Sequence, residues 1–246
     1  MRDGFQLYWS EVGNKAGGRT VDIRLEDKAS CKADEGLTKA RKLVERDGVH
    51  VLGGIICTPV AYALRSYVIE KKMPIIIMNA GADGITQRQK SDYMFRSAFA
   101  NSDSSHPLGD WAYKQGYRKA VIMASDFGAG YEQIGGFARD LANIRKDADV
   151  VAVFFAGADA LRFVQQYAEY GLKGKLPLIG KGFLVDEVIL PRQGAAAEGI
   201  VTSLHWSAAL ETPANKRFLE AYQAKYKRPA AVYAEQGYVG AQLIAK

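Results

Sequence analysis

Apolar runs of strand length alternate with segments of helical periodicity along this chain, and that alternation constrains the fold most. Strands separated by helices pair in parallel, and the helices then cover the faces of the sheet. The sequence predicts strands at 20–25, 49–53, 74–78, 120–124, 150–155, 176–179 and 199–203. It predicts helices at 4–13, 34–46, 60–70, 103–115, 129–144, 160–170, 213–225 and 232–245, with a short one near 186–190. The expected fold class is α/β, with two doubly wound lobes and mainly parallel sheets.

The pattern restarts near residues 98–102, which marks the boundary between the two lobes. We expect an N-terminal lobe at 1–98, to which 231–246 return, and a C-terminal lobe at 99–230. No low-complexity linker lies at this boundary, which favours a tight hinge. The chain starts on a helix, so the first strand of a doubly wound N-terminal lobe is missing, and it stops inside an apparent helix. Both ends suggest a fragment.

Composition and motifs exclude several classes of function. The chain has 246 residues, of which 48% are hydrophobic and 24% charged, as in ordinary globular proteins. No window approaches the ~18 uncharged apolar residues of a membrane span, and no signal peptide is visible. The net charge of +6 is spread over helix faces without interleaved aromatics, which argues against a nucleic-acid partner. Phosphate-loop, dinucleotide and hydrolase motifs are missing, so neither an enzyme nor a cofactor is expected.

The two cysteines, Cys31 and Cys57, follow neighbouring predicted strands at the same end. This placement suggests a disulfide and therefore an oxidising compartment. With both cysteines paired and the histidines isolated, no metal site is expected. Thr58 comes next, and it places a hydroxyl at the carboxyl end of a strand, where open α/β sheets bind ligands.

Small or polar residues follow most of the predicted strands. They are Cys57-Thr58, Asn79-Ala80-Gly81-Ala82, Asp126-Phe127-Gly128, Gly157-Ala158-Asp159, Gly180-Lys181-Gly182 and His205-Trp206. Turn chemistry alone explains any one of these loops. Six loops at one end of the strands favour a small-molecule pocket, because glycines and helix N-termini present N–H groups to a ligand. Phe127 and Trp206 are either ligand contacts or core aromatics.

These residues, in this order and spacing, resemble those of a known family. The resemblance rests on Gly54-x-x-Cys57-Thr58, Pro74-Ile-Ile-Ile-x-Asn79-Ala80-Gly81-Ala82, Asp126-Phe127-Gly128, Pro213-x-Asn215-Lys216-x-Phe218 and Tyr233-x-x-x-Gly237-Tyr238. The chain looks like a type I periplasmic binding protein of the branched-chain amino acid binding (receptor) family, which feeds ABC importers. That resemblance implies two hinged lobes, a periplasmic location, a membrane permease as partner and a monomer. It also implies the Cys31–Cys57 disulfide and a signal peptide ahead of this chain.

Carried over residue by residue, the resemblance implies a ligand site. The hydroxyl contact to a ligand carboxylate falls on Thr58, and the backbone contacts fall on Asn79, Ala80 and Gly81. The aromatic wall falls on Phe127. A carboxylate is well served by a few fixed neutral donors of this kind. The remaining expected ligand contacts are Tyr131, Ala158, Lys181 and Trp206.

The chain departs from the family pattern at two places. Amino acid binders carry an acidic residue for the ligand ammonium in the loop where this chain has Lys181. A cation there repels an ammonium, so an organic acid is favoured, with an aromatic carboxylate such as benzoate as the example. The alternative is that Lys181 points to solvent. The family also carries about one more strand and helix between Asp140 and Leu141.

The sequence therefore favours a solute-binding protein that closes on a small carboxylate by hinge motion and delivers it to a permease. An amino acid binder of the same family is the first alternative. A ligand-sensing domain of a signalling or regulatory protein is the alternative from another class, and an enzyme is the least favoured.

Overall fold

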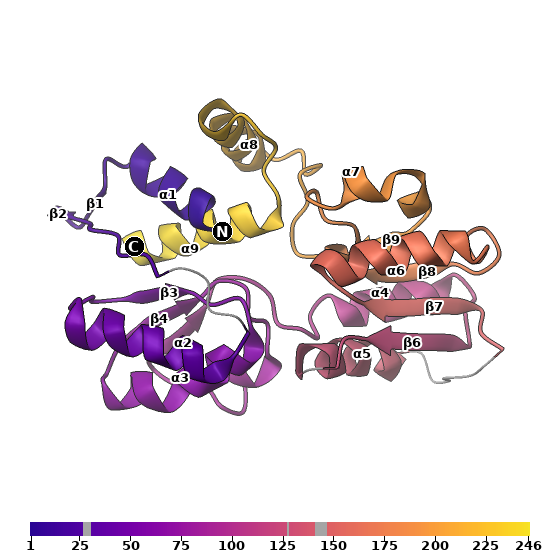
Figure 1. Cartoon of the computed structure of the whole chain (residues 1–246), viewed down its shortest axis with the longest axis horizontal. Coiled ribbons are helices and arrows are strands. Elements are labelled where there is room, and N and C mark those ends of the chain that lie inside the picture. Colours follow the sequence, from indigo (N-terminus) through magenta and orange to yellow (C-terminus); the bar gives the residue numbers. More distant parts are fainter. Residues whose placement is uncertain (27–30, 127, 141–146) are drawn as a thin grey trace. The chain divides into compact units, whose positions relative to one another are not determined.

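A computed structural model describes residues 1–26, 31–126, 128–140 and 147–246 (Figure 1). The chain forms two compact units. Unit 1 comprises Met1–Phe99 and Ala208–Lys246, and unit 2 comprises Ala100–Ser207. The α/β class with parallel sheets is confirmed. The segment 208–230 differs from the expectation, since it belongs to unit 1 and not to the second lobe.

Unit 1 has a three-stranded parallel sheet in the order β3-β4-β5. Its strands are β3 (Leu52–Gly54), β4 (Ile75–Ile77) and β5 (Met94–Arg96). The central strand is three isoleucines, all buried, as expected for a strand covered on both faces. Two helices pack against each other beside this sheet, α2 (Ala33–Arg41), which continues as a π turn over Lys42–Arg46, and α3 (Thr58–Glu70).

The predicted strand at 20–25 does not form, and this is a correction. The structure has a small antiparallel hairpin of β1 (Lys15–Ala16) and β2 (Arg19–Thr20), followed by residues 21–26 without regular structure. Leu25 is 52% exposed. The alternation in Val21–Leu25 is that of a half-buried strand, but none of the strands in the described part of unit 1 hydrogen-bonds to it.

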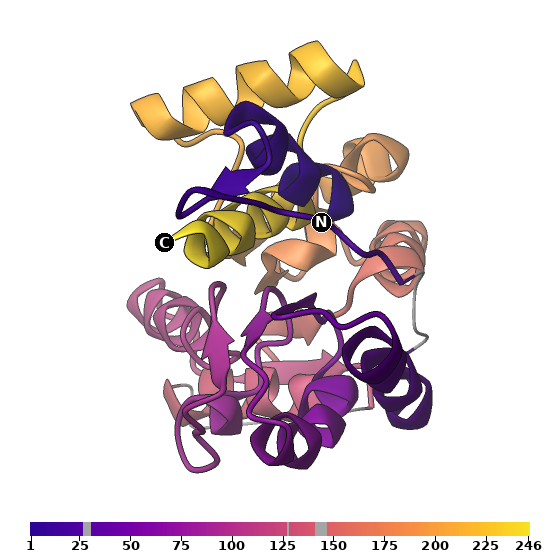
Figure 2. The ribbon, with the colours of Figure 1, turned by 90° about the vertical axis from the view of Figure 1, so that its left-hand side faces the viewer.

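Three helices complete unit 1, namely α1 (Arg2–Glu11), α8 (Pro213–Tyr226) and α9 (Val232–Ala245) (Figure 2). Helices α1 and α9 approach closely because a glycine on each of them faces the backbone at the start of the other. A Cβ on Gly4 would lie 1.8 Å from the Ala234 carbonyl oxygen, and one on Gly237 would lie 2.0 Å from that of Met1. The first and last helices of the chain therefore pack directly against each other.

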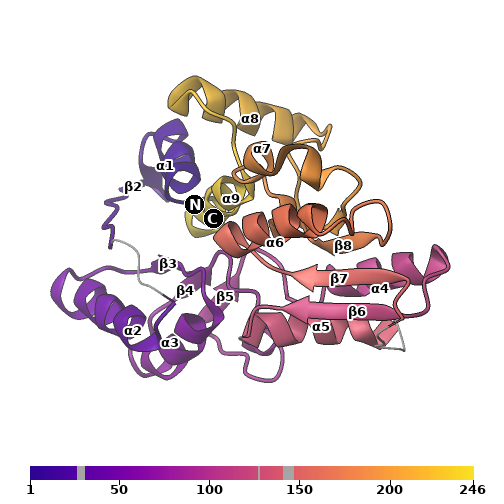
Figure 3. The same ribbon diagram turned by 45° about the vertical axis from the view of Figure 1, so that its right-hand side comes forward.

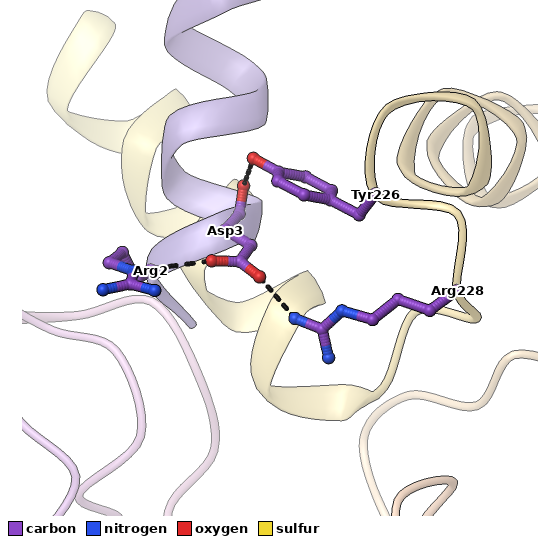
Figure 4. Close-up of polar contacts among 4 residues, drawn as sticks. All are labelled: Arg2, Asp3, Tyr226 and Arg228. Carbon is purple, nitrogen blue, oxygen red and sulfur yellow. Dashed lines mark hydrogen bonds and ion pairs between the residues drawn. The ribbon is translucent and has the colours of Figure 1, made fainter.

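Polar contacts between α1 and the end of α8 explain why 208–230 joins unit 1 (Figure 4). The Tyr226 hydroxyl donates to the Asp3 carbonyl oxygen at 2.8 Å, and the Arg228 guanidinium pairs with the Asp3 carboxylate. Helix α8 begins after Thr212, whose hydroxyl accepts from the Asn215 N–H at 3.2 Å. An amphipathic helix pattern predicts α8 but does not say which lobe it packs on.

Unit 2 has a four-stranded parallel sheet in the order β6-β7-β8-β9 (Figure 1), of which Figure 3 labels β6, β7 and β8. The strands are β6 (Ala120–Ala124), β7 (Val150–Phe154), β8 (Leu178–Lys181) and β9 (Val201–Ser203). Alternate residues of β7 face two cores. Val151 and Val153 pack with α6 (Gly157–Glu169), whereas Val150 and Ala152 pack with α4 (Ser105–Lys114) and α5 (Gly128–Asp140). The sheet is thus covered on both faces.

The short elements between β8 and β9 are η3 (Gly182–Val185), α7 (Leu190–Gln193) and η4 (Gly194–Ala197). The short helix predicted near 186–190 therefore begins later, because the buried Asp186 accepts hydrogen bonds from the N–H groups of Val188 and Ile189 and holds a turn there. Residues 141–144 of the predicted helix 129–144 lie outside the described residues.

Candidate functional site

A disulfide joins Cys31 to Cys57, as predicted from their positions. Their Cα atoms are 5.4 Å apart. Cys31 comes two residues before α2, and Cys57 is the residue before α3, so the bond holds the N-termini of these two helices together. The bond therefore fixes the start of the helix that carries Thr58.

Thr58 is the first residue of α3 and is 4% exposed. Cys57 before it makes no side-chain cap, and Pro59 has no N–H to offer. The first turn of a helix leaves N–H groups directed outward and carries partial positive charge. Thr58 thus places a hydroxyl at a helix N-terminus that is suited to an anion.

Asn79, Ala80 and Gly81 follow β4 and are all buried. The Asn79 Nδ2 donates to the Gln236 Oε1 at 2.7 Å. The Ala80 N–H donates to the Ile55 carbonyl oxygen at 3.0 Å, so this N–H is already used within unit 1. This bond departs from the expected role of the Ala80 backbone as a ligand donor.

Two residues of this region were missed by sequence reasoning. Ile55, between β3 and Cys57, has φ +48°, which costs a β-branched residue about 1–3 kcal/mol and is concentrated at functional sites. Gln236 lies in α9, is 2% exposed and holds Asn79. Its Nε2 has no hydrogen-bond partner among the described residues. The Gly53-Gly54 pair was a sequence signal for an unusual backbone conformation near Ile55. No pattern in the apolar segment around Gln236 marks that residue.

We expect Gln236→Leu to destabilise unit 1 by about 1–3 kcal/mol, because the buried Asn79 amide loses its acceptor. Chemical denaturation measures this change in the free energy of unfolding. Gln223→Leu, on the exposed face of α8, is the matched control and should change it by less than about 0.5 kcal/mol. Equal effects of the two substitutions would show that the Asn79–Gln236 bond contributes nothing.

In unit 2, Lys181 is the last residue of β8 and is 2% exposed. The solvent-facing alternative for Lys181 is therefore wrong. Lys181 lines a cavity of about 20 Å³, which is room for roughly one water molecule. The polar lining of this cavity is Lys181, Ser105 and Gln133, and its other lining residues are apolar or glycine.

Ser105 and Gln133 belong to a buried polar network that sequence reasoning also missed. The Ser105 hydroxyl donates to the Gln133 Oε1 at 2.7 Å, and the Gln133 Nε2 donates to the Asn101 Oδ1 at 3.0 Å. The Asn101 Nδ2 donates to the Glu132 carboxylate at 2.7 Å. Buried networks of this kind hold side chains in one arrangement, here next to Lys181.

The remaining expected contacts all follow the carboxyl ends of strands in unit 2. Tyr131 is 66% exposed in α5, and its hydroxyl donates to the Asp126 carboxylate, which raises the pKa of Tyr131. Ala158 is exposed in the first turn of α6, whereas Trp206 is buried after β9. Phe127 lies outside the described residues. Because the strands are parallel, Tyr131, Ala158 and Trp206 come after the same end of the sheet as Lys181.

Asp186 shapes the chain just after Lys181. Its Oδ1 accepts from the N–H groups of Val188 at 2.8 Å and Ile189 at 3.2 Å. Burial raises the pKa of Asp186 above its ordinary 3.8, and the two hydrogen bonds offset part of this rise. A raised pKa in the folded state means that stability from this group is present at low pH and falls as the pH rises through the folded pKa.

We expect Asp186→Asn to be at least as stable as the parent at pH 7, since the amide keeps the acceptor oxygen without a buried charge. Relative to the parent, the variant should gain stability between pH 4 and pH 7. Asp186→Ala, which loses the acceptor, should lose about 1 kcal/mol. Denaturation of the three proteins at both pH values tests this, and an Asn variant that loses stability relative to the parent as the pH rises would contradict it.

Within the described ranges, no group of three or more His, Cys, Asp or Glu side chains is placed to hold a metal ion. None of the helices in that part of the chain is long and apolar enough to cross a membrane.

The sequence profile of the periplasmic binding protein family matches residues 1–145 and 141–246. Among curated proteins, "Leu/Ile/Val-binding protein homolog 6" of Brucella melitensis is 28% identical over 257 residues, covering 94% of this chain. The chain spans 65% of the length of that relative.

Solved structures agree with this match. A solute-binding protein of an ABC transporter from R. palustris, in complex with benzoate, is 31% identical with a TM-score of 0.90. An ABC transporter substrate-binding protein from Sphaerobacter thermophilus is 34% identical with a TM-score of 0.91. Each comparison covers 99% of this chain and 74% of the other. LivJ from Streptococcus pneumoniae, in complex with isoleucine, has the same fold at 21% identity, with a TM-score of 0.86 over 99% of this chain and 77% of LivJ. Because the family profile matches this chain from residue 1 to residue 246, the chain belongs to the periplasmic binding protein family.

Proposed function

We propose that this chain is the solute-binding component of an ABC importer and that it binds a small carboxylate, with an aromatic acid favoured. The observation that carries the proposal is Lys181, a buried cation at the carboxyl end of β8. A charged side chain is costly to bury and is kept where it meets a charge or strong acceptors. A ligand carboxylate at this end of the strand would add a favourable interaction between opposite charges.

The other candidate contacts fit an acid as well. Thr58 offers a hydroxyl at the N-terminus of α3, and Asn79 lies two residues after the end of β4. Trp206 and Tyr131 offer aromatic surface in unit 2. The benzoate complex of the R. palustris relative, at 31% identity, supports the aromatic class. Phe127, Gly81 and Ala158 remain predicted contacts from the family resemblance. Ala80 remains one only through atoms other than its N–H, which is bonded to Ile55.

The location and the partner are part of the same proposal, and the family match supports them. The protein works outside the cytoplasm, in the periplasm, and hands its ligand to a membrane permease without chemical conversion. Hinge closure on the ligand, delivery behind a signal peptide and independence from nucleic acid rest on the resemblance and composition alone.

A branched-chain amino acid is the second candidate ligand. The names of the curated relatives favour it, since they are Leu/Ile/Val-binding protein homologues. Lys181 argues against it, because a buried cation repels the α-ammonium of an amino acid.

A thermal-shift panel separates the candidates. Benzoate, 4-hydroxybenzoate, leucine and isoleucine are each added to the purified protein. A ligand at 100 times its dissociation constant stabilises by about 2.7 kcal/mol, a rise in Tm of roughly 5–10 °C for a chain of this size. We expect the rise with the two aromatic acids. A rise in Tm with leucine or isoleucine alone would assign the protein to the amino acid binders. No rise in Tm with any of the four compounds would exclude both candidate ligand classes.

A further inference from the structure

The small cavity inside unit 2 brings together three buried polar side chains. Lys181 and Ser105 are each 2% exposed, and Gln133 is 3% exposed. Ser105 belongs to α4, Gln133 to α5 and Lys181 to the end of β8, so the cavity lies between two helices and the sheet that they cover. Its volume of about 20 Å³ accommodates one water molecule, which needs about two to four polar partners. The size and the lining therefore suit a single bound water.

Glu132 sets the direction of the hydrogen bonds in the network beside this cavity. A carboxylate only accepts, so Asn101 turns its Nδ2 toward Glu132, at 2.7 Å, and its Oδ1 toward Gln133. Gln133 then donates from its Nε2 to Asn101 at 3.0 Å and presents its Oε1 to the Ser105 hydroxyl at 2.7 Å. The chain of hydrogen bonds thus ends at the cavity in an acceptor oxygen.

The oxygens at this end of the network can accept further hydrogen bonds. The Gln133 Oε1 has two lone pairs and uses one for the Ser105 hydroxyl. The Ser105 hydroxyl has one proton, directed to Gln133 or to the Asn101 carbonyl oxygen at 3.0 Å, and its own lone pairs remain. An ammonium has three N–H donors and no acceptor, so Lys181 complements these two oxygens.

We propose that this cavity holds one water, which accepts a hydrogen bond from the Lys181 ammonium and donates to the Gln133 Oε1 and the Ser105 Oγ. The water and the two oxygens supply hydrogen bonds that a buried charge requires. Gln133 and Ser105 are thus positioning residues, which hold Lys181 in place through the water and do not touch the ligand. Their effect on ligand affinity rests on the proposed function, whereas the water does not.

A high-resolution crystal structure of the whole protein without ligand tests the water directly. We expect one ordered water within hydrogen-bond distance of the Lys181 Nζ, the Gln133 Oε1 and the Ser105 Oγ. Gln133→Met keeps the length of the side chain and removes the acceptor, so the water should be lost and the ammonium should move. A cavity without water in the parent would overturn the proposal, and so would an unmoved Lys181 in the variant.

A double-mutant cycle tests whether Gln133 acts through Lys181. Gln133→Met alone should weaken benzoate binding by about 2- to 10-fold, the effect of one hydrogen bond on affinity. In a protein that already carries Lys181→Met, the same substitution should have no further effect, since the ammonium is gone. Gln166→Met, at an exposed position of α6, is the matched control and should leave the affinity unchanged.

Ser105→Ala is the second variant, because it keeps the amide bonds of the network in place even where Gln133→Met prevents folding. It should weaken benzoate binding by a similar factor, and again only when Lys181 is present. Equal weakening in the two backgrounds would overturn the positioning role. Absence of benzoate binding in the parent would reject the proposed function instead, and the crystal structure without ligand would still decide whether the water is bound.

Discussion

Replacing Lys181 with methionine is expected to lower the affinity for benzoate by about 10- to 150-fold. A hydrogen bond to a charged group contributes about 1.5–3 kcal/mol, and each 1.4 kcal/mol is a factor of ten in affinity. Lys181 is 2% exposed at the carboxyl end of β8, so little water screens its charge. Equilibrium dialysis with labelled benzoate measures the affinity of the parent and the variant.

The matched control is Lys175→Met, which removes an exposed lysine from the same unit and should leave the affinity unchanged. Lys181→Glu is a second test variant. Its carboxylate should abolish benzoate binding, because like charges repel. Denaturation of each variant separates loss of binding from loss of folding. Unchanged benzoate affinity in a folded Lys181→Met protein would assign Lys181 a structural role instead.

Removing the disulfide should have the largest effect on stability. The bond joins residues separated by 26 positions, and closing a loop of that size restricts the unfolded chain by about 3 kcal/mol. We expect Cys31→Ala with Cys57→Ala, or reduction of the parent, to lower the Tm by roughly 6–12 °C. Thermal unfolding with and without a reductant measures this, and the double variant serves as the control, since a reductant should no longer affect it.

The disulfide also bears on the site, because Cys57 is the residue before the helix that begins with Thr58. A reduced protein that keeps its Tm would show that the packing of α2 on α3 alone determines the stability of this region. Ligand affinity measured on the reduced protein below its Tm would then show whether the bond positions Thr58.

Local patterns predicted much of the fold because the elements concerned are bounded by clear signals. The run Ile75–Ile77 reads as a buried parallel strand, and the structure buries all three residues. The segment Val21–Leu25 reads equally well as a strand, yet it stays unpaired, because pairing depends on a neighbour that the local sequence does not contain. The Cys31–Cys57 bond was predicted from two strands, of which the structure forms only the one before Cys57, so the pairing is confirmed although half of its reason is wrong.

Contacts between residues far apart in the sequence determine the features of the fold and the site that local patterns did not predict. Helix α8 joins unit 1 through the contacts of Asp3 with Tyr226 and Arg228, residues more than two hundred positions apart in the chain. The burial of Lys181 depends on the packing of α4 and α5 against the end of β8, and the Gly-Lys-Gly loop did not reveal it. The role of Gln236 could not be predicted, because a single amide side chain in an apolar helix produces no periodic pattern.

The most direct test of the proposed function is a calorimetric titration of the whole protein with benzoate and, separately, with leucine. The account predicts saturable binding of benzoate at one site per chain and at least tenfold weaker binding of leucine, because Lys181 attracts the carboxylate and repels the ammonium. Saturable binding of leucine with no heat from benzoate would contradict it, and Lys181 would then lie outside the ligand site.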